Sequence, residues 1–157
     1  MTGAKASRLA LATAGWALPL YAAHAQAAGD YGNASPAAGS WSHVAVAGGS
    51  EAHFRDSGGT IRVIIACARA TRQVTVARTS AAPATTISVW TSTMARTIPA
   101  RFDPNAMRVS AQLAPYDGLL DAIAFSRGRF AVSMPGFPAL VVSAAPEAAR
   151  VIEDCRS

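Results

Sequence analysis

The sequence lacks the short motifs that mark most catalytic and cofactor-binding sites. It contains no Gly-x-Ser-x-Gly nucleophile elbow, no Walker phosphate-binding loop, no Cys-x-x-Cys pair and no His-Glu-x-x-His zinc motif. It has 3 histidines and 2 cysteines, so the side chains that most often bind transition metals are few. We therefore expect a protein without a catalytic residue, a bound metal or a cofactor.

Clusters of charge are also missing. The chain has 14 basic and 9 acidic residues, and no run of basic residues long enough to act as a nucleic-acid-binding tail. Lys5 and Arg8 lie close to the N-terminus; without them the remaining basic residues are all arginine and the net charge falls from +5 to +3. We expect no nucleic-acid partner and a weak attraction to anionic surfaces at most.

The N-terminal segment has the layout of a secretory signal peptide. Lys5 and Arg8 precede an apolar run over residues 9–22, and small residues follow at 23–25 and 25–27, each an Ala-x-Ala cleavage pattern. The apolar run is shorter than the roughly 20 residues that cross a membrane comfortably. We predict a signal peptide over residues 1–25, export to the periplasm or the medium, and no stable membrane span after cleavage. The alternative is an uncleaved anchor.

The remainder of the chain reads as a flexible leader followed by one domain rich in β-strands. Residues 26–40 are rich in Ala, Gly and Ser without periodicity, which is typical of a linker. Apolar and polar residues alternate in several stretches beyond it, most clearly over 107–113, 60–68 and 72–78. We predict a single β-rich domain over residues 41–157, mainly β in class. It would be a small antiparallel sandwich or barrel of about eight short strands.

Two segments near the C-terminus have helical spacing. Over residues 117–128, Asp117 is a candidate N-cap, apolar residues follow at helical intervals, Arg127 falls in the last turn and Gly128 follows the end. Over residues 146–155, Pro146 begins a segment whose apolar residues recur at intervals of three and four. We predict two short helices.

The two cysteines are predicted to form a disulfide. Cys67 falls on the apolar face of an alternating strand, and Cys155 falls on the apolar face of the last helix. An exported chain with an even number of cysteines favours pairing. Cys67 and Cys155 would then fasten the C-terminal helix to the sheet. The alternative is two unrelated buried thiols.

Two polar patterns could carry chemistry. Asp56 lies in an Asp-Ser-Gly triplet that resembles the motif of retropepsin-like aspartic proteases, whose chemistry needs two such aspartates sharing a proton; a loop between strands is the alternative. His43 and His53 would need to share one face to bind a metal. A two-residue turn at residues 48–49 would pair His43 with Phe54 and send the two imidazoles to opposite faces.

Surface residues offer weaker candidates. Arg127 and Arg129 flank Gly128 and could contact an anion, although an arginine in a last helical turn also complements the helix dipole. Asp117 and Asp121 lie four residues apart and could form a carboxylate pair, or act separately as a cap and a solvated acid. Trp90 and Tyr116 are aromatic candidates for an exposed binding surface.

Residues 119–156 have a distinctive order of expected elements: a helix, an Arg-Gly turn, two strands joined by a Gly turn, a second helix and a terminal Cys. This stretch resembles a group of small uncharacterised exported proteins from alphaproteobacteria. More distantly it looks like the invasion-associated locus B family of periplasmic β-domains. The resemblance implies a small exported β-domain whose last strand leads into a short helix, and it implies no catalytic residues.

These observations lead to one expectation about function and two alternatives. We expect an exported, envelope-associated or binding module without catalytic activity, whose partner is an envelope protein or a glycan. One alternative is an aspartic-protease-like hydrolase that uses Asp56. The other is a purely structural periplasmic protein without a ligand.

Overall fold

The structure is a computed structural model that describes residues 31–157. The predicted signal peptide and residues 26–30 of the predicted leader lie outside the described residues. The rest of that leader is in contact with the domain: the backbone N–H of Ala37 donates to the carbonyl of Val141 at 2.8 Å. Tyr31 lies edge-on to Trp90, with ring centroids 6.1 Å apart.

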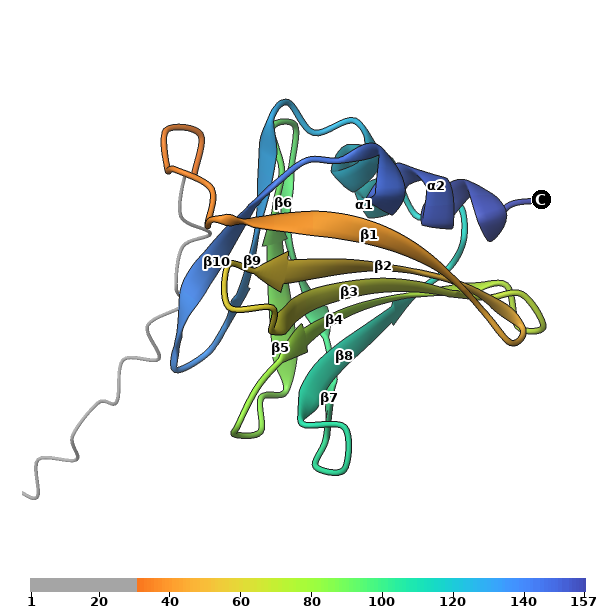
Figure 1. The fold of residues 1–157 in the computed structure, drawn as a ribbon, viewed down its shortest axis with the longest axis horizontal. Helices are drawn as coiled ribbons and strands as arrows, with labels where there is room; N and C mark the ends of the chain where they lie inside the picture. The colour runs from red at the N-terminus through yellow and green to blue at the C-terminus, as the bar shows by residue number, and fades with distance from the viewer. Residues whose placement is uncertain (1–30) are drawn as a thin grey trace, which may run out of the picture.

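The larger of two sheets has six antiparallel strands in the order β1-β2-β3-β4-β8-β7 (Figure 1). Its first four strands follow one another along the chain as hairpins. The bounds are β1 (Gly39–Val46), β2 (Gly49–Asp56), β3 (Ile61–Ala68), β4 (Gln73–Thr79), β7 (Arg101–Asp103) and β8 (Arg108–Leu113).

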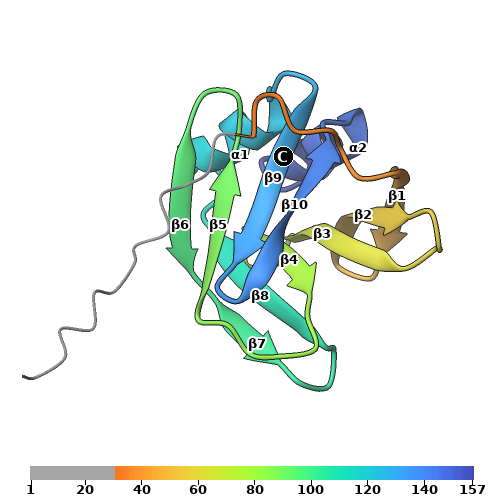
Figure 2. The same cartoon turned by 90° about the vertical axis from the view of Figure 1, so that its left-hand side faces the viewer.

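The smaller sheet has four antiparallel strands in the order β10-β9-β5-β6. The bounds are β5 (Thr86–Trp90), β6 (Ala95–Pro99), β9 (Arg129–Met134) and β10 (Phe137–Ser143). Its strands run across those of the larger sheet, so the two sheets stack as crossed layers (Figure 2). The mainly-β prediction is confirmed in its sandwich form; the barrel alternative is wrong, because the strands of the described residues form two open sheets.

One strand expected from the sequence is divided between the sheets. Residues 96–102 read as a single alternating stretch, but β6 ends at Pro99 in the small sheet and β7 begins at Arg101 in the large one. The chain changes sheets at Ala100, whose N–H donates to the carbonyl of Thr85 at 2.8 Å. Such corners join the layers of orthogonal sandwiches. The described part of the chain therefore has ten strands where about eight were expected.

The two predicted helices are present, and both close one end of the sandwich. α1 (Gly118–Ala124) begins at Asp117, whose carboxylate accepts the N–H of Leu119, as an N-cap should. α2 (Pro146–Asp154) lies over the inner face of β1, β2 and β3 and also contacts α1 (Figure 1). The expectation that Arg127 lies in the last turn of a helix is wrong, because α1 ends at Ala124.

The core joins both sheets and both helices in one apolar cluster. Trp41 links the layers, with ring centroids 5.6 Å from Phe54 and 5.9 Å from Phe130. Fully buried members come from every layer: Phe54, Ile65 and Val76 from the large sheet, Ile87, Phe130 and Val132 from the small one, and Leu119, Leu120, Ile123, Val151 and Ile152 from the helices.

The strand registers test two specific expectations. A tight loop around residues 70–71 would pair Cys67 with Val74 and Ile65 with Val76, and the β3–β4 hairpin has both pairs. The β1–β2 turn is not at residues 48–49, because Val46 pairs with Gly49 and the turn is Ala47-Gly48. Gly48 has φ +83°, which a glycine adopts without strain, and Gly49 is a strand residue whose Cα lies against the Cys67 carbonyl.

Candidate functional site

The disulfide between Cys67 and Cys155 is present and fastens the end of α2 to β3. The two Cα atoms are 5.4 Å apart, and both residues are buried, at 4 % and 1 % exposure. The bond closes a segment of 88 residues. It fixes α2 against the large sheet and so determines which side chains of β1 and β2 the helix meets.

Asp56 lies at the end of β2 and its carboxylate is held by the following turn. Oδ1 accepts the backbone N–H groups of Gly58 and Thr60, each at 3.0 Å, and Oδ2 accepts from the guanidinium of Arg62 at 3.2 Å. This is a carboxylate that shapes a loop. An aspartic-protease dyad would instead leave one carboxyl oxygen facing a second aspartate.

The two histidines leave opposite faces of the β1–β2 hairpin. His43 pairs with Ala52 and His53 pairs with Ser42, so the predicted pairing of His43 with Phe54 is wrong by two residues. An even shift preserves the faces, and the expected separation of the imidazoles holds. His53 contacts Glu51 at 2.6 Å on the outer face. No group of three metal-binding side chains occurs within residues 31–157.

The inner face of the same hairpin carries a polar cluster that sequence reasoning missed. The Ser50 hydroxyl donates to Oδ2 of Asp154 at 2.7 Å, and Nε2 of His43 lies 3.2 Å from the same oxygen. The Ser50 hydrogen bond, assisted by that from His43, holds the pKa of the Asp154 carboxyl below its ordinary value against the opposing effect of burial.

The arrangement of this cluster does not create a nucleophile. In a Ser-His-Asp triad the imidazole lies between the hydroxyl and the carboxylate and takes the hydroxyl proton. Here Asp154 lies between Ser50 and His43, and Ser50 is buried, with 1 % of its surface exposed.

A cavity of about 370 Å³ opens beside His43 and is lined by Pro146, Glu147 and Arg150 of α2.

The two acids of α1 do not form a carboxylate pair. Asp117 accepts from the Arg96 guanidinium through both oxygens at 2.8 Å, and Asp121 accepts from Arg156 at 2.7 Å. Burial alone would raise the pKa of Asp117, but the hydrogen bonds from Arg96 and Leu119 outweigh it and the pKa lies below its ordinary value. Both acids are neutralised by a neighbouring arginine.

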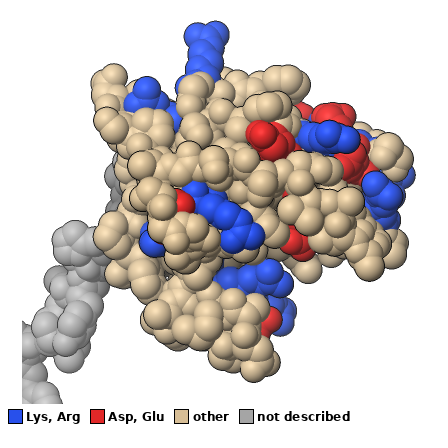
Figure 3. Space-filling view, in the orientation of Figure 1, with Lys and Arg blue, Asp and Glu red and all other residues tan. Residues whose placement is uncertain are grey.

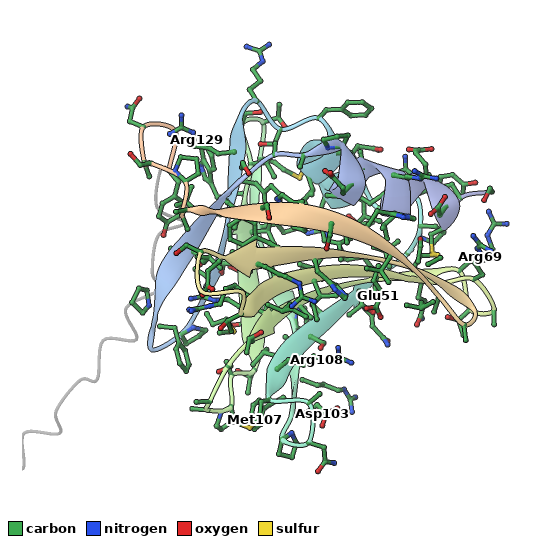
Figure 4. All side chains as sticks on the ribbon, viewed as in Figure 1. Glu51, Arg69, Asp103, Met107, Arg108 and Arg129 are labelled. Atoms are coloured by element: carbon green, nitrogen blue, oxygen red, sulfur yellow. A yellow bond between two sulfur atoms is a disulfide. The ribbon has the colours of Figure 1, made fainter. Side chains whose placement is uncertain are left out.

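Arg127 and Arg129 do not form a joint anion-binding site. The Arg129 guanidinium donates to the carbonyl of Ala34, so it is bound to the start of the described chain (Figure 4). The Arg127 guanidinium makes no hydrogen bond or ion pair with any residue of the described range, and its backbone N–H donates to Ser92 Oγ at 2.9 Å. Of these two arginines, Arg127 is the one whose guanidinium is available to an external anion.

Charged side chains on the face shown in Figure 3 are spread among uncharged ones and do not form one basic patch. This agrees with the dispersed arginines of the sequence. Broad electrostatic attachment to a polyanion would need a denser cluster. On this face, a binding surface would therefore consist of a few exposed side chains.

Neither of the two aromatic residues that the sequence suggests for a binding surface is free of contacts within the domain. Trp90 is half-buried and in contact with Tyr31. Tyr116 is 68 % exposed, but the guanidinium of Arg156 stacks 5.6 Å from its ring centroid and its hydroxyl donates to the Arg156 carbonyl. Its exposed ring is already part of the contacts that hold the C-terminus.

Phe125 is the exposed aromatic residue that sequence reasoning missed. It follows α1 as the C-cap, is 76 % exposed, and takes part in no aromatic or cation–π pair within residues 31–157. Met94, in the β5–β6 turn, is 39 % exposed. We call Met94, Phe125 and Arg127 the Phe125 surface. The sequence signal was its place in the helical pattern: residue 125 falls outside the buried set of Leu119, Leu120 and Ile123.

The two loops that carry the Phe125 surface are hydrogen-bonded to each other. The N–H of Ser92 donates to Ser126 Oγ at 3.1 Å, and the N–H of Arg127 donates to Ser92 Oγ at 2.9 Å. Ser126 is 7 % exposed and its hydroxyl donates to the Arg129 carbonyl. The exposed side chains therefore project from a braced pair of loops at one end of the small sheet.

Comparison with known proteins gives no family for this chain: no family model, no curated protein and no solved structure matches it.

Proposed function

We propose that this chain is an exported, envelope-associated binding module without catalytic activity, and that it binds through the Phe125 surface. The observation that carries the proposal is Phe125 itself. A phenylalanine that is 76 % exposed at the edge of a well-packed domain is unusual enough to mark a contact site when an exposed methionine and an unpaired arginine accompany it.

Export to the periplasm or the medium is supported by two features. The N-terminal segment has the charge and hydrophobicity pattern of a signal peptide. The Cys67–Cys155 disulfide is of the kind that persists in oxidising compartments. No helix within residues 31–157 is long and apolar enough to cross a membrane. The resemblance of residues 119–156 to small exported envelope proteins agrees with this assignment.

The absence of catalysis is supported by how the polar side chains are used. Both carboxyl oxygens of Asp56 accept hydrogen bonds, Oδ1 from the following turn and Oδ2 from Arg62, which disfavours the aspartic-protease-like alternative. Ser50 donates to Asp154, and no imidazole of residues 31–157 makes a hydrogen bond with its hydroxyl to take its proton. Both side chains make hydrogen bonds that stabilise the fold, and these bonds account for their positions.

The proposal is tested by site-specific photo-crosslinking in cells. A benzophenone amino acid replaces Phe125 in one variant and Val46 in a matched control. Val46 is also exposed, at 38 %, but lies at the end of β1 in the β1–β2 hairpin. The proposal predicts crosslinked adducts from position 125 that are at least several-fold more abundant than those from position 46.

Equal labelling at both positions, or none at position 125, would contradict the proposal. It would favour instead a purely structural periplasmic protein. The variants must retain the disulfide, which is checked by gel mobility with and without reductant, because an unfolded chain labels without selectivity.

A further inference from the structure

We infer that the Phe125 surface docks onto the anionic phospholipid surface of a membrane. The Phe125 ring and the Met94 side chain would enter the interface, and the Arg127 guanidinium would contact lipid phosphate. The inference rests on the proposed function and names the partner of that same surface. Exposed Phe and Trp side chains favour the boundary between the lipid headgroups and the acyl chains, because their apolar rings leave water there.

The apolar part of the surface is placed for shallow insertion. Met94 lies in the turn between β5 and β6, and Phe125 lies in the loop between α1 and β9. The two loops reach the same end of the small sheet in both views (Figures 1 and 2). Exposed apolar side chains at loop ends meet a flat surface before the body of the domain does.

The loops are held in the conformation that presents these side chains. Besides the bonds between Ser92, Ser126 and Arg127, Thr91 Oγ1 accepts the N–H of Met94 at 3.1 Å and donates to its carbonyl at 2.9 Å. Thr91 is 2 % exposed. A preorganised loop loses little conformational entropy on docking, so even a small contact area gives measurable binding.

The charge around the surface complements an anionic layer. Residues 91–94 and 125–129 contain no acidic side chain and include Arg127 and Arg129. The acids of the adjacent α1, Asp117 and Asp121, are paired with Arg96 and Arg156. The exposed end is therefore net positive, and each basic group near an anionic leaflet favours attachment.

The strength of such a contact is limited. One aromatic ring, one methionine and one free arginine give reversible and salt-sensitive attachment, far weaker than that of a membrane-spanning helix. Docking of this kind would keep the domain at the membrane without a span among residues 31–157.

Vesicle co-sedimentation tests the inference. The chain recovered from the periplasm is mixed with vesicles of phosphatidylcholine alone or with about 30 % phosphatidylglycerol, a content at which each basic residue adds to binding. We expect several-fold more protein in the pellet with the anionic vesicles. We expect Phe125→Ser to lower that fraction at least about fivefold, the effect of removing one interfacial aromatic side chain.

Two further variants separate the parts of the inference. Arg127→Ser should abolish most of the preference for anionic vesicles while leaving weak binding to neutral ones, and raised salt should act in the same direction. Val46→Ser removes an apolar group that is 38 % exposed in the β1–β2 hairpin, away from the Phe125 surface, and should bind as the unmodified protein does. Each variant is checked by circular dichroism and for its disulfide.

The outcomes distinguish this inference from the proposed function. Equal binding by the unmodified chain and Phe125→Ser, or no binding to anionic vesicles, would overturn the lipid assignment. If position 125 then crosslinks to a protein in cells, the binding module stands with a protein partner. If position 125 neither crosslinks nor supports vesicle binding, both fail.

Discussion

Arg78 shows how a single residue can join the two layers of the fold. It lies on the inner face of β4, is 5 % exposed, and donates to the carbonyls of Val132 at 2.8 Å and Pro138 at 2.7 Å in the small sheet. Burial lowers the pKa of its guanidinium, with the charge of Arg62 acting in the same direction. Pro138 lies where the β9–β10 pairing shifts register, so Arg78 satisfies a carbonyl at the irregularity.

Replacing Arg78 should therefore destabilise the fold. Arg78→Met keeps the apolar stem and removes both hydrogen bonds, and we expect the free energy of unfolding to fall by about 2–4 kcal/mol because charge-assisted bonds are lost and carbonyls are left buried. Urea unfolding measures the change. Arg101→Met, at an exposed position of β7, is the control and should change stability little; an equal loss in both variants would contradict this role.

A second residue-scale prediction concerns Asp154 and pH. Its pKa is lowered in the folded state, chiefly by the Ser50 hydrogen bond, so its ionised form stabilises the fold above the ordinary carboxyl pKa of about 4. That contribution is lost as the pH falls below about 4 and through the lower folded-state pKa. Asp154→Asn should show a shallower loss of unfolding free energy over this acidic range.

The measurement is urea unfolding at a series of pH values from neutral to strongly acidic. Ser50→Ala is a matched variant, because it removes the largest cause of the shift and leaves the carboxylate in place. Parallel pH profiles for the unmodified chain and Asp154→Asn would contradict the role of this carboxylate.

At the scale of elements, the C-terminal helix depends on its covalent attachment. α2 is short and follows directly from β10, and a terminal helix of this length frays readily. The Cys67–Cys155 bond restrains it by closing a segment of 88 residues. We expect the double variant Cys67→Ser, Cys155→Ser to lose about 4–5 kcal/mol at most, on the chain-entropy estimate.

Thermal and urea unfolding of the oxidised chain, the reduced chain and the double serine variant measure this contribution. Reduced chain and variant should agree with each other and unfold well before the oxidised chain. Unfolding of all three at one urea concentration would show that packing of α2 alone holds the helix in place.

The elements themselves were largely predictable, whereas some boundaries were not. Alternation in residues 60–68 and 72–78 gave the β3–β4 register, and helical spacing placed Cys155 toward the core. The end of α1 was missed because Arg127 and Gly128 make a plausible helix terminus, while the chain leaves the helix at Phe125. The change of sheet at Ala100 was missed because alternation continues across it.

The polar clusters were harder to predict for a physical reason. Ser50 and His43 meet Asp154 across 104 and 111 residues of sequence, a contact that only the docking of α2 creates. Arg78 is different: the alternation that places Val74 and Val76 inside also places Arg78 inside, so the signal was available. The exposure of Phe125 also had a signal, because residue 125 lies off the helical face that carries Leu119, Leu120 and Ile123. The signal is weak, since an apolar residue near a helix end is usually buried.

At the scale of the whole molecule, the domain is a two-layer sandwich closed by two helices and a disulfide, with the Phe125 surface at one end. The central claim is that this domain leaves the cytoplasm and acts in the envelope. Every functional proposal depends on it, and it rests on the predicted signal peptide and on a disulfide of the kind that persists in oxidising compartments.

The most direct test is the intact mass of the protein recovered from the periplasm, after alkylation with and without prior reduction. We predict a chain that begins near residue 26 or 28, lacks the two thiol hydrogens and takes up alkylating agent only after reduction. A full-length chain with both Cys67 and Cys155 alkylated before reduction would contradict export, the compartment and the envelope function together.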